Sequence, residues 1–408
     1  MKKNVSLEEA RALLLEKASP VQECYVSLGN ALGRVISQDI TAGENSPPFT
    51  KSPLDGYALL AKDTKTAGEP GGVLLEVIEE VPAGYFPVKK IVPGTAIKVM
   101  TGAPLPEGAD VVVRYEDAVR QENYIRLNCA LQAGSNVIYE GEDIIKGETV
   151  ANKGTLLTPP FVGLLASIGT AKVPVFAKVR VAVFSTGDEL LDPAQKLQPG
   201  KIYNSNLHSL LAACQQLGAE PLSFGVVPDA QEATAERLAA ALNEADIVIT
   251  TGGVSVGDYD VVIDALKALE ANIIFWQVDM KPGSPVVAAE KNNKLIICLS
   301  GNPAAAFITF DLLAVPVIKK MMGLSRHLPV QVAATFVDHF EKSSPQRRFL
   351  RARLFRQDET NFIKLTGKQS NGILKSLLDC NALIDVPAGH DGLTAGQKVS
   401  AVVVGSID

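Results

Sequence analysis

Residues 178–325 alternate short apolar runs with helix-like segments, and this alternation constrains the fold more than any other feature of the chain. The runs include VRVAVFST, DIVITTGG and KLIICLS, and stretches such as AQEATAERLAAALNEA separate them. Apolar runs of this kind are typical of strands buried on both faces between layers of helices. The pattern therefore predicts an α/β domain with a parallel sheet, whose ligands would bind at the carboxyl ends of its strands.

The rest of the chain predicts three further units around the α/β domain of residues 178–325. Short β-like runs separated by Gly/Pro turns predict a mostly β domain over residues 46–143. The segments that flank it, 1–45 and 144–177, are expected to form one discontinuous helical or linker domain. About five short strands over 326–408 predict a small β-barrel domain at the C-terminal end. The expected fold class is thus multidomain, α/β plus β.

Three helices are expected in the flanking segments. Ser6 and Glu9 predict a capping box at the start of the first, which Pro20 closes. Apolar residues at helical spacing predict a second helix near 27–36 and a third over 159–168.

Composition excludes several classes of protein. Of the 408 residues, 47% are hydrophobic and 21% charged, which is ordinary for a packed globular protein. The net charge of −6 argues against general nucleic-acid binding, which needs a basic surface. No stretch approaches the roughly 18 apolar residues that span a bilayer, and the N-terminus does not resemble a signal peptide. The five cysteines form no CxxC pair and the four histidines show no metal-ligand spacing, which favours reduced thiols in a cytoplasmic protein without a zinc site.

Glycines and hydroxyls follow several of the predicted strands of the α/β domain. Glycines let backbone amides approach a phosphate, and the start of a helix favours negative charge. Ser300–Pro303 is expected to open such a helix, with Asn302 as its cap and Pro303 in its first turn. Each loop alone is explained as well by an ordinary turn between a strand and a helix. Together, at one edge of the sheet, the loops favour a ligand site. The candidate substrate-binding residues in these loops are Thr186, Gly187, Asp188, Asp229, Gly252, Gly253, Ser255, Gly257, Ser300, Gly301, Asn302 and Pro303.

Carboxylates crowd the same edge of the predicted sheet. Asp188, Glu189, Asp229, Asp258 and Asp260 all come just after strands. A phosphate pocket lined with acids repels its ligand unless a cation intervenes, and Mg²⁺ takes carboxylate, water and phosphate oxygens together. The alternative is that each acid is a helix cap or a first-turn charge, and Asp229 is the strongest candidate for a cap alone.

A second cluster of candidates lies in the first half of the chain. Asp55 occurs in SPLDGYA, Thr101 opens TGAP after a strand, and Asp143 ends GED. Ordinary turn chemistry explains each of these residues in isolation about as well as function does.

These motifs together resemble one known family. The segments PPFTKSPLDGYA, VMTGAPLPEGADVVV, GED, VFSTGDEL, TTGGVSVGDYD, KPGSP and SGNPAAAF occur in this order across nearly the whole chain. The chain resembles the molybdopterin molybdotransferases, the MoeA family, whose eukaryotic counterpart is the E domain of gephyrin. Loops like TTGGVSVG and SGNP also occur in the related adenylyltransferases and in CinA-type proteins, whereas SPLDGYA and TGAPLPEGAD separate this family from them.

The resemblance implies an elongated, four-part subunit and a homodimer. Its active site would lie between the α/β domain of one chain and the β domain of the other. The implied reaction converts adenylylated molybdopterin and molybdate to molybdenum cofactor and AMP, with Mg²⁺, as the last step of cofactor synthesis. The implied partners are a small pterin substrate and, transiently, the molybdopterin adenylyltransferase, with no nucleic acid and no membrane.

On this hypothesis the catalytic residues are Asp55, Asp143, Glu189 and Asp258. Glu189 and Asp258 would hold the cation or position water, with help from Asp229. Asp55, Asp143 and the substrate-binding Thr101 would come from the partner subunit. In KPGSP, Lys281 would neutralise the charge of phosphate or molybdate, next to Ser284.

Two departures from the family pattern remove positive charge where an oxyanion should bind. Ser284 stands where many members have a lysine, and Ile138-Tyr139-Glu140 stands where many have an arginine before GED. Lys51 is a candidate to compensate. The departures keep two alternatives open, a paralogue that inserts tungstate and a catalytically weak scaffold or binding member. An adenylyltransferase is a further alternative, which the large share of the chain outside the α/β domain disfavours.

Overall fold

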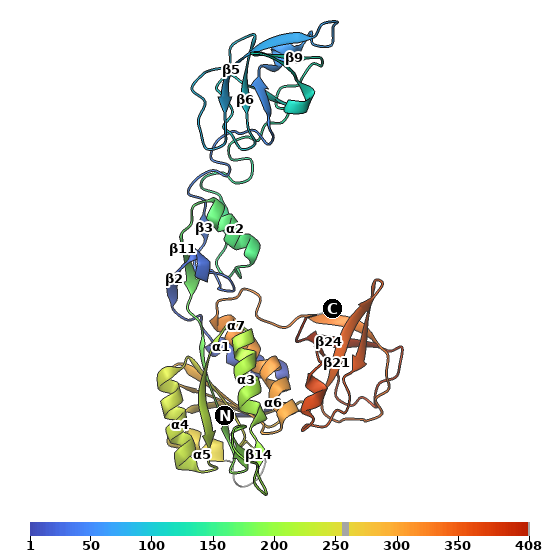
Figure 1. Cartoon of the computed structure of the whole chain (residues 1–408). Helices are drawn as coiled ribbons and strands as arrows, with labels where there is room; N and C mark the ends of the chain where they lie inside the picture. The colour runs from blue at the N-terminus through green and yellow to red at the C-terminus, as the bar shows by residue number, and fades with distance from the viewer. Residues whose placement is uncertain (255–260, 407–408) are drawn as a thin grey trace.

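A computed structural model describes residues 1–254 and 261–406 of the chain. The molecule is elongated (Figure 1), with a six-stranded sheet at one end and a seven-stranded sheet at the other. A small region around helix α2 joins the two sheets, and a closed barrel lies beside the larger one. The fold class is therefore multidomain α/β plus β, as predicted. Among the described residues, no helix combines the length and the apolar character needed to cross a bilayer.

The larger sheet has the strand order β1-β17-β18-β19-β16-β12-β15. In chain order its strands are β1 Lys2–Val5, β12 Arg180–Thr186, β15 Glu220–Val227, β16 Ile247–Thr251, β17 Asn272–Val278, β18 Val287–Lys291 and β19 Lys294–Leu299. Strands β15, β12, β16 and β19 are neighbours and run parallel. Consecutive side chains of β12 enter different hydrophobic clusters, Val183 on one face and Phe184 on the other. Both faces are therefore buried, which explains the nearly continuous apolar runs of the sequence.

Helices cover the two faces of this sheet. Helices α4 and α5 lie on one side, and α1, α3, α6 and α7 on the other (Figure 1). The bounds are α1 Leu7–Lys17, α3 Ser205–Gln216, α4 Gln231–Glu244, α5 Val261–Ala268, α6 Pro303–Thr309 and α7 Val315–Met321. A π-helical turn, Phe310–Ala314, joins α6 to α7.

Two strands of this sheet differ from the sequence-based expectation. Strand β18 was not predicted and runs antiparallel to both β17 and β19, so the sheet is mixed. Asn292 and Asn293 form its turn with φ of 53° and 60°, the left-handed pair that a tight hairpin requires. Strand β1 pairs in parallel with β17, and α1 packs on α7. The first residues of the chain therefore lie with the large sheet and not with the linker segment.

The N-terminal capping box is only half formed. Ser6 Oγ accepts a hydrogen bond from Glu9 N at 3.1 Å, as expected. The Glu9 carboxylate accepts instead from Lys2 Nζ at 2.6 Å, on the strand before the helix.

The segments before and after the six-stranded sheet pair with each other. Strand β2 Glu23–Ser27 pairs with β11 Lys172–Phe176, and β3 Ile40–Thr41 with β10 Thr149–Ala151. Helix α2, Pro159–Ser167, covers them as predicted. The helix expected near 27–36 is wrong. A 3₁₀ turn, Leu28–Asn30, is followed by a second turn, in which Gly33 has φ +73°, and then by isolated bridges of Val35 with Leu156 and of Ile36 with Val175.

The six-stranded sheet has the order β7-β4-β6-β5-β9-β8. Its strands are β4 Gly56–Leu59, β5 Val73–Val81, β6 Thr95–Val99, β7 Val111–Arg114, β8 Val119–Gln121 and β9 Tyr124–Leu127, with 3₁₀ turns at Ala61–Thr64 and Tyr115–Asp117. Tyr57 and Ala58, adjacent on β4, belong to different buried clusters. The sheet thus has apolar packing on both faces although no helix layer covers it.

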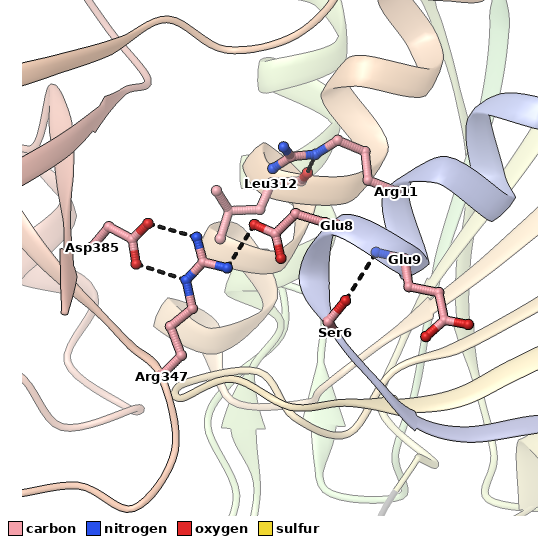
Figure 2. Close-up of polar contacts among 7 residues, drawn as sticks. All are labelled: Ser6, Glu8, Glu9, Arg11, Leu312, Arg347 and Asp385. Carbon is pink, nitrogen blue, oxygen red and sulfur yellow. Dashed lines mark hydrogen bonds and ion pairs between the residues drawn. The ribbon is translucent and has the colours of Figure 1, made fainter. Parts of the chain in front are cut away.

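The predicted C-terminal barrel is closed by five strands in the order β20-β22-β21-β23-β24. They are β20 Gln331–Phe336, β21 Arg348–Gln357, β22 Thr360–Leu365, β23 Ala382–Val386 and β24 Lys398–Val403, with a 3₁₀ turn at Leu374–Leu377. Leu350 fills the barrel, whereas Phe349 and Leu383 face outward into the core of the large sheet domain. Arg347 adds ion pairs with Asp385 of the barrel and Glu8 of α1 (Figure 2). The barrel is therefore docked firmly on the α/β unit.

Candidate functional site

A cavity of about 440 Å³ opens at the carboxyl ends of β12, β16 and β19. These strands are neighbours and parallel, so the loops that follow them meet at one edge. Nine predicted residues line it, namely Thr186, Glu189, Asp229, Gly252, Gly253, Ser300, Gly301, Asn302 and Pro303. Four residues that were not predicted also line it, namely Leu190, Ile202, Asn206 and Pro285. A second cavity, of about 470 Å³, lies between α3, α7 and the end of the barrel and contains none of the predicted residues.

Close contact between loops explains the glycines. Gly252 has φ +93°, and a Cβ placed on it would lie 2.3 Å from the Thr186 carbonyl oxygen. A Cβ on Gly253, whose φ is +65°, would lie 2.7 Å from Val262 Cγ2. Gly301 is less constrained, since its nearest neighbour would be Gly252 Cα at 3.5 Å. The two glycines after β16 are therefore required by packing, and they leave backbone facing the cavity.

Buried polar side chains support the floor of the cavity. Ser185 Oγ lies 2.8 Å from Thr251 Oγ1 and 3.2 Å from Asn204 Oδ1. Asn204 Oδ1 also accepts from Leu207 N at 3.1 Å and so caps α3. Asn206, in the first turn of α3, donates from Nδ2 to the Gly301 carbonyl at 2.8 Å. The start of α3 therefore fixes the loop after β19. The helix cap at Asn204 was a signal that sequence analysis could have used.

The start of α6 differs from the predicted anion-receiving helix end. Asn302 occupies the N-cap position, but its side chain makes no capping bond. Its backbone N–H donates to Ser300 Oγ at 3.3 Å instead. The N–H of Ala304 donates to the carbonyl of Asn371, a barrel residue, at 3.0 Å. Because α6 opens with a proline and one of its free amides is already paired, little of this helix end is left for an anion.

The carboxylates near the cavity influence one another. Asp229 N donates to Asp188 Oδ1 at 3.3 Å, and Glu189 and Asp229 both line the cavity. Partial burial raises the pKa of Asp229, and the charges of Glu189 and Asp188 raise it further. The alternative that Asp229 is only a helix cap is wrong, because Ala230 occupies the N-cap position of α4. Asp188 and Gly187 stand just outside the cavity lining.

The cavity offers hard oxygen donors to a cation. Within residues 1–254 and 261–406, no group of three His, Cys, Asp or Glu side chains could hold a metal ion by itself. Mg²⁺ typically binds one or two carboxylates together with phosphate and water oxygens, so Glu189 and Asp229 fit that requirement. Four predicted residues, Ser255, Gly257, Asp258 and Asp260, lie outside the described residues, Asp258 being the second predicted metal ligand.

Lys281 and Ser284 lie on the segment that borders the cavity, but only Pro285 of that segment lines it. Lys281 is exposed, and its backbone pairs with the barrel. Its N–H donates to Arg347 O and its carbonyl accepts from Phe349 N, both at 2.8 Å.

The predicted residues of the six-stranded region lie apart from the cavity, and two of them, Asp55 and Thr101, contact each other. Asp55 Oδ1 accepts from Thr101 N at 2.7 Å and from Thr101 Oγ1 at 2.8 Å. These two bonds hold the pKa of Asp55 below its usual value, and the bond from the Thr101 backbone amide has the larger effect. Asp143 N donates to Ser46 O at 3.0 Å, and Asp143 is exposed. The Lys51 backbone pairs with Ile138 at 2.9 and 3.0 Å, which brings the basic residue next to the segment that lacks an arginine.

One chain does not bring the two groups together. Thr101 follows β6, at the end of the molecule opposite to β14, Ile202–Tyr203, which borders the cavity (Figure 1).

Comparison with known proteins identifies the family. Residues 5–169 match the MoeA N-terminal region (domain I and II), residues 182–320 a probable molybdopterin binding domain, and residues 333–404 the MoeA C-terminal region (domain IV). A protein of Staphylococcus epidermidis named molybdopterin molybdenumtransferase is 34% identical over 402 residues, which is 98% of this chain and 96% of that protein. A Bacillus subtilis protein of the same name is 37% identical over 384 residues, 93% and 89% of the two chains. The chain belongs to the molybdopterin molybdenumtransferase family.

Solved structures of the family agree with this architecture. The crystal structure of a molybdopterin biosynthesis MoeA protein from Pyrococcus horikoshii has a TM-score of 0.87 at 30% identity, covering 99% of this chain and all of that one. A second structure from the same organism gives a TM-score of 0.83 at 33% identity, covering 98% and 100%. In the family's terms, the cavity belongs to the region matched to the molybdopterin binding domain, and Asp55 and Thr101 to the MoeA N-terminal region.

Proposed function

We propose that this protein transfers molybdenum from molybdate to adenylylated molybdopterin and releases AMP, as the final step of molybdenum cofactor synthesis. The observation that carries the proposal is the cavity itself. It combines tightly packed glycines with Glu189 and Asp229 and lies in the region that matches a molybdopterin binding domain.

The chemistry of the cavity suits a phosphoanhydride substrate. The backbone of Gly252 and Gly253 and the Ser300 hydroxyl would bind the phosphate and pterin end. Glu189, with Asp258, would hold Mg²⁺, which supplies charge to neutralise the diphosphate as the P–O–P bond breaks. Asp229, whose pKa is raised, would position the oxygen nucleophile and can accept its proton.

We propose that the active form is a homodimer in which Asp55, Thr101 and Asp143 complete the partner's cavity. The separation of the two groups within one chain supports this arrangement. Asp55 stays ionised because its pKa is lowered, so it can orient Lys281 or a substrate hydroxyl across the interface.

We also propose the domain boundaries 1–45 with 144–177, 46–143, 178–325 and 326–408, with the first residues of the chain packed on the α/β domain. The cytoplasm is the proposed location, and the adenylyltransferase that makes the substrate is a proposed transient partner.

The deciding experiment measures AMP release from adenylylated molybdopterin with Mg²⁺, with and without molybdate, and then with tungstate. Molybdate-dependent AMP release with metal retained on the pterin supports the proposal. Greater activity with tungstate would make Ser284 and the missing arginine features of metal selectivity. Tight binding of the adenylate without AMP release would contradict the enzymatic proposal and favour a scaffold role.

The shared site has its own test. Asp55→Ala and Glu189→Gln dimers are each expected to be inactive. Random exchange of their subunits should restore about a quarter of wild-type activity, because half of the dimers are mixed and each mixed dimer has one intact site. No recovery after verified exchange would contradict a site built from two subunits.

A further inference from the structure

Among the residues that the structure describes, Arg351 is the largest side chain that the fold buries completely. It lies on β21 with 0% of its surface exposed. Its neighbour Leu350 fills the barrel, so Arg351 points outward, on the side that packs against the α/β unit. A buried guanidinium is costly unless it is hydrogen-bonded, and replacing it by an apolar side chain is often neutral or stabilising. Its presence there therefore calls for an explanation other than stability.

The contacts of Arg351 are concentrated on one barrel loop. Nη2 donates to the carbonyls of Lys368 and Ser370, both at 3.1 Å. Gln369, between them, closes the clamp, since its Oε1 accepts from Arg351 N at 2.9 Å and its Nε2 donates to Arg351 O at 3.1 Å. Burial lowers the pKa of Arg351. In the part of the chain that the structure describes, Nε and Nη1 have no hydrogen-bond partner, so the fold keeps this arginine at a cost.

The next residue of the clamped loop supports the candidate site. The Asn371 carbonyl accepts from Ala304 N at 3.0 Å, in the first turn of α6. The cavity residues Ser300–Pro303 come immediately before Ala304. No side chain caps this helix start, so the barrel carbonyl substitutes for a cap.

We propose that Arg351 is a positioning residue for the Ser300–Pro303 loop, acting through Lys368–Asn371 and the amide of Ala304. The proposal rests on the proposed function only in so far as that loop binds substrate. On this proposal the C-terminal barrel contributes to the reaction by holding in place the loop that forms one wall of the cavity. Arg351 does not line the cavity, so it would act only through these residues.

Two variants loosen the clamp and one serves as the matched control. Arg351→Met removes the two bonds to the loop and keeps an apolar stem of similar length. Gln369→Leu removes the other half of the clamp without touching the buried charge. Arg356→Met is the matched control, because Arg356 lies on the same strand, β21, and its exposed side chain is not part of the clamp.

The first readout is hydrogen exchange of the Ala304 amide, which does not require activity. Exchange is expected to accelerate about tenfold in Arg351→Met and Gln369→Leu, and to stay unchanged in Arg356→Met. The second readout is the split between KM and kcat. Loosening a binding loop should raise KM for the adenylate about fivefold and change kcat less. Arg351→Lys, which keeps one donor group, should recover part of both effects.

The outcomes separate this proposal from the proposed function. Unchanged Ala304 exchange in the folded Arg351→Met and Gln369→Leu proteins would overturn it, as would an equal acceleration in Arg356→Met. Faster exchange with an unchanged KM in an active enzyme would show that the clamp does not serve the substrate loop and would also overturn it. Absence of AMP release by the wild type would refute the proposed function, while the exchange measurement would still test the clamp.

Discussion

Thr186 and Gly252 lie so close that the carbonyl oxygen of the first would be 2.3 Å from a Cβ on the second. Thr186 ends β12, Gly252 directly follows the neighbouring strand β16, and both residues line the cavity. The contact packs two loops of the candidate site against each other, so the shape of the cavity depends on a glycine.

Substituting this glycine should therefore be costly. Gly252→Ala combines a steric clash with a left-handed φ of +93°, and we expect it to lower the free energy of unfolding by about 2–4 kcal/mol. Gly301→Ala is the matched control, because its added Cβ would meet only the Gly252 backbone, with Cα nearest at 3.5 Å, an ordinary contact. Denaturant unfolding of the two variants tests this. Equal stability of both would contradict the contact.

Local sequence patterns were enough to predict the strands of the α/β domain and the position of the loops that follow them. The apolar runs that became β12, β16 and β19 indicate strands buried on both faces, and parallel strands bring their loops to one edge. The loops around Thr186, Gly252 and Ser300 could therefore be predicted to meet before the structure was known.

Contacts between segments far apart in the chain could not be predicted, because they produce no local sequence pattern. The pairing of β1 with β17 and the bond from Ala304 N to Asn371 O join residues far apart in the chain. The hairpin of β18 was different, since Asn292-Asn293 between two apolar runs is a recognisable turn signal that was missed. In the helix expected near 27–36, apolar spacing was overridden by β pairing of Ile36 with Val175.

Removing the charge of Glu189 should lower the pKa of Asp229. The Asp229 carboxyl has a raised pKa from burial and from the charges of Glu189 and Asp188, so Glu189→Gln relieves part of the repulsion. NMR titration of the Asp229 carboxyl measures the change. Glu244→Gln, at the far end of α4, is the control and should leave the pKa where it is.

The same repulsion predicts how stability depends on pH. A carboxyl whose pKa is raised by folding binds its proton more tightly in the folded state. Its ionisation therefore lowers the free energy of unfolding, an effect that is absent below the ordinary pKa of about 3.9 and grows as the pH rises above it. Glu189→Gln should therefore gain stability over the wild type at neutral pH and not at pH 3. In the wild type, Mg²⁺ should raise the Tm, and by less in the variant. If the difference in stability between Glu189→Gln and the wild type were the same at pH 3 and at neutral pH, the repulsion would be contradicted.

Arg347 should stabilise the docked barrel in a pH-dependent way. It donates to Asp385 at 2.7 and 2.6 Å and to Glu8 at 2.6 Å. We expect Arg347→Met to lower the free energy of unfolding by about 2 kcal/mol at pH 7. Lys267→Met removes an exposed pair with Asp264 and should cost less than about 0.5 kcal/mol.

Glu8 determines how the stabilisation by Arg347 changes at low pH. Partial burial alone would raise the pKa of Glu8, but the hydrogen bond from Arg347 and the charges of Arg347 and Arg11 outweigh it and lower that pKa. The contribution of Glu8 is thus present above the ordinary pKa of about 4.3 and lost as the pH falls through the lowered value. Urea unfolding of wild type and Arg347→Met between pH 7 and 2.5 should show their difference shrinking below pH 4. A constant difference would show that Arg347 acts through packing alone.

Asp55 and Thr101 should matter for activity and little for folding. Both residues are exposed, and the bonds between them lie at the surface. We expect Asp55→Ala to reduce AMP release about 100-fold or more, with an unchanged circular dichroism spectrum and Tm. Because the pKa of Asp55 is lowered, the wild-type carboxylate is ionised from pH 5 to 9, so the loss should be uniform across that range. Thr101→Val, which removes the hydroxyl bond and keeps the backbone one, should give a smaller loss that Thr101→Ser does not show. Full activity of Asp55→Ala would remove the six-stranded region from the active site.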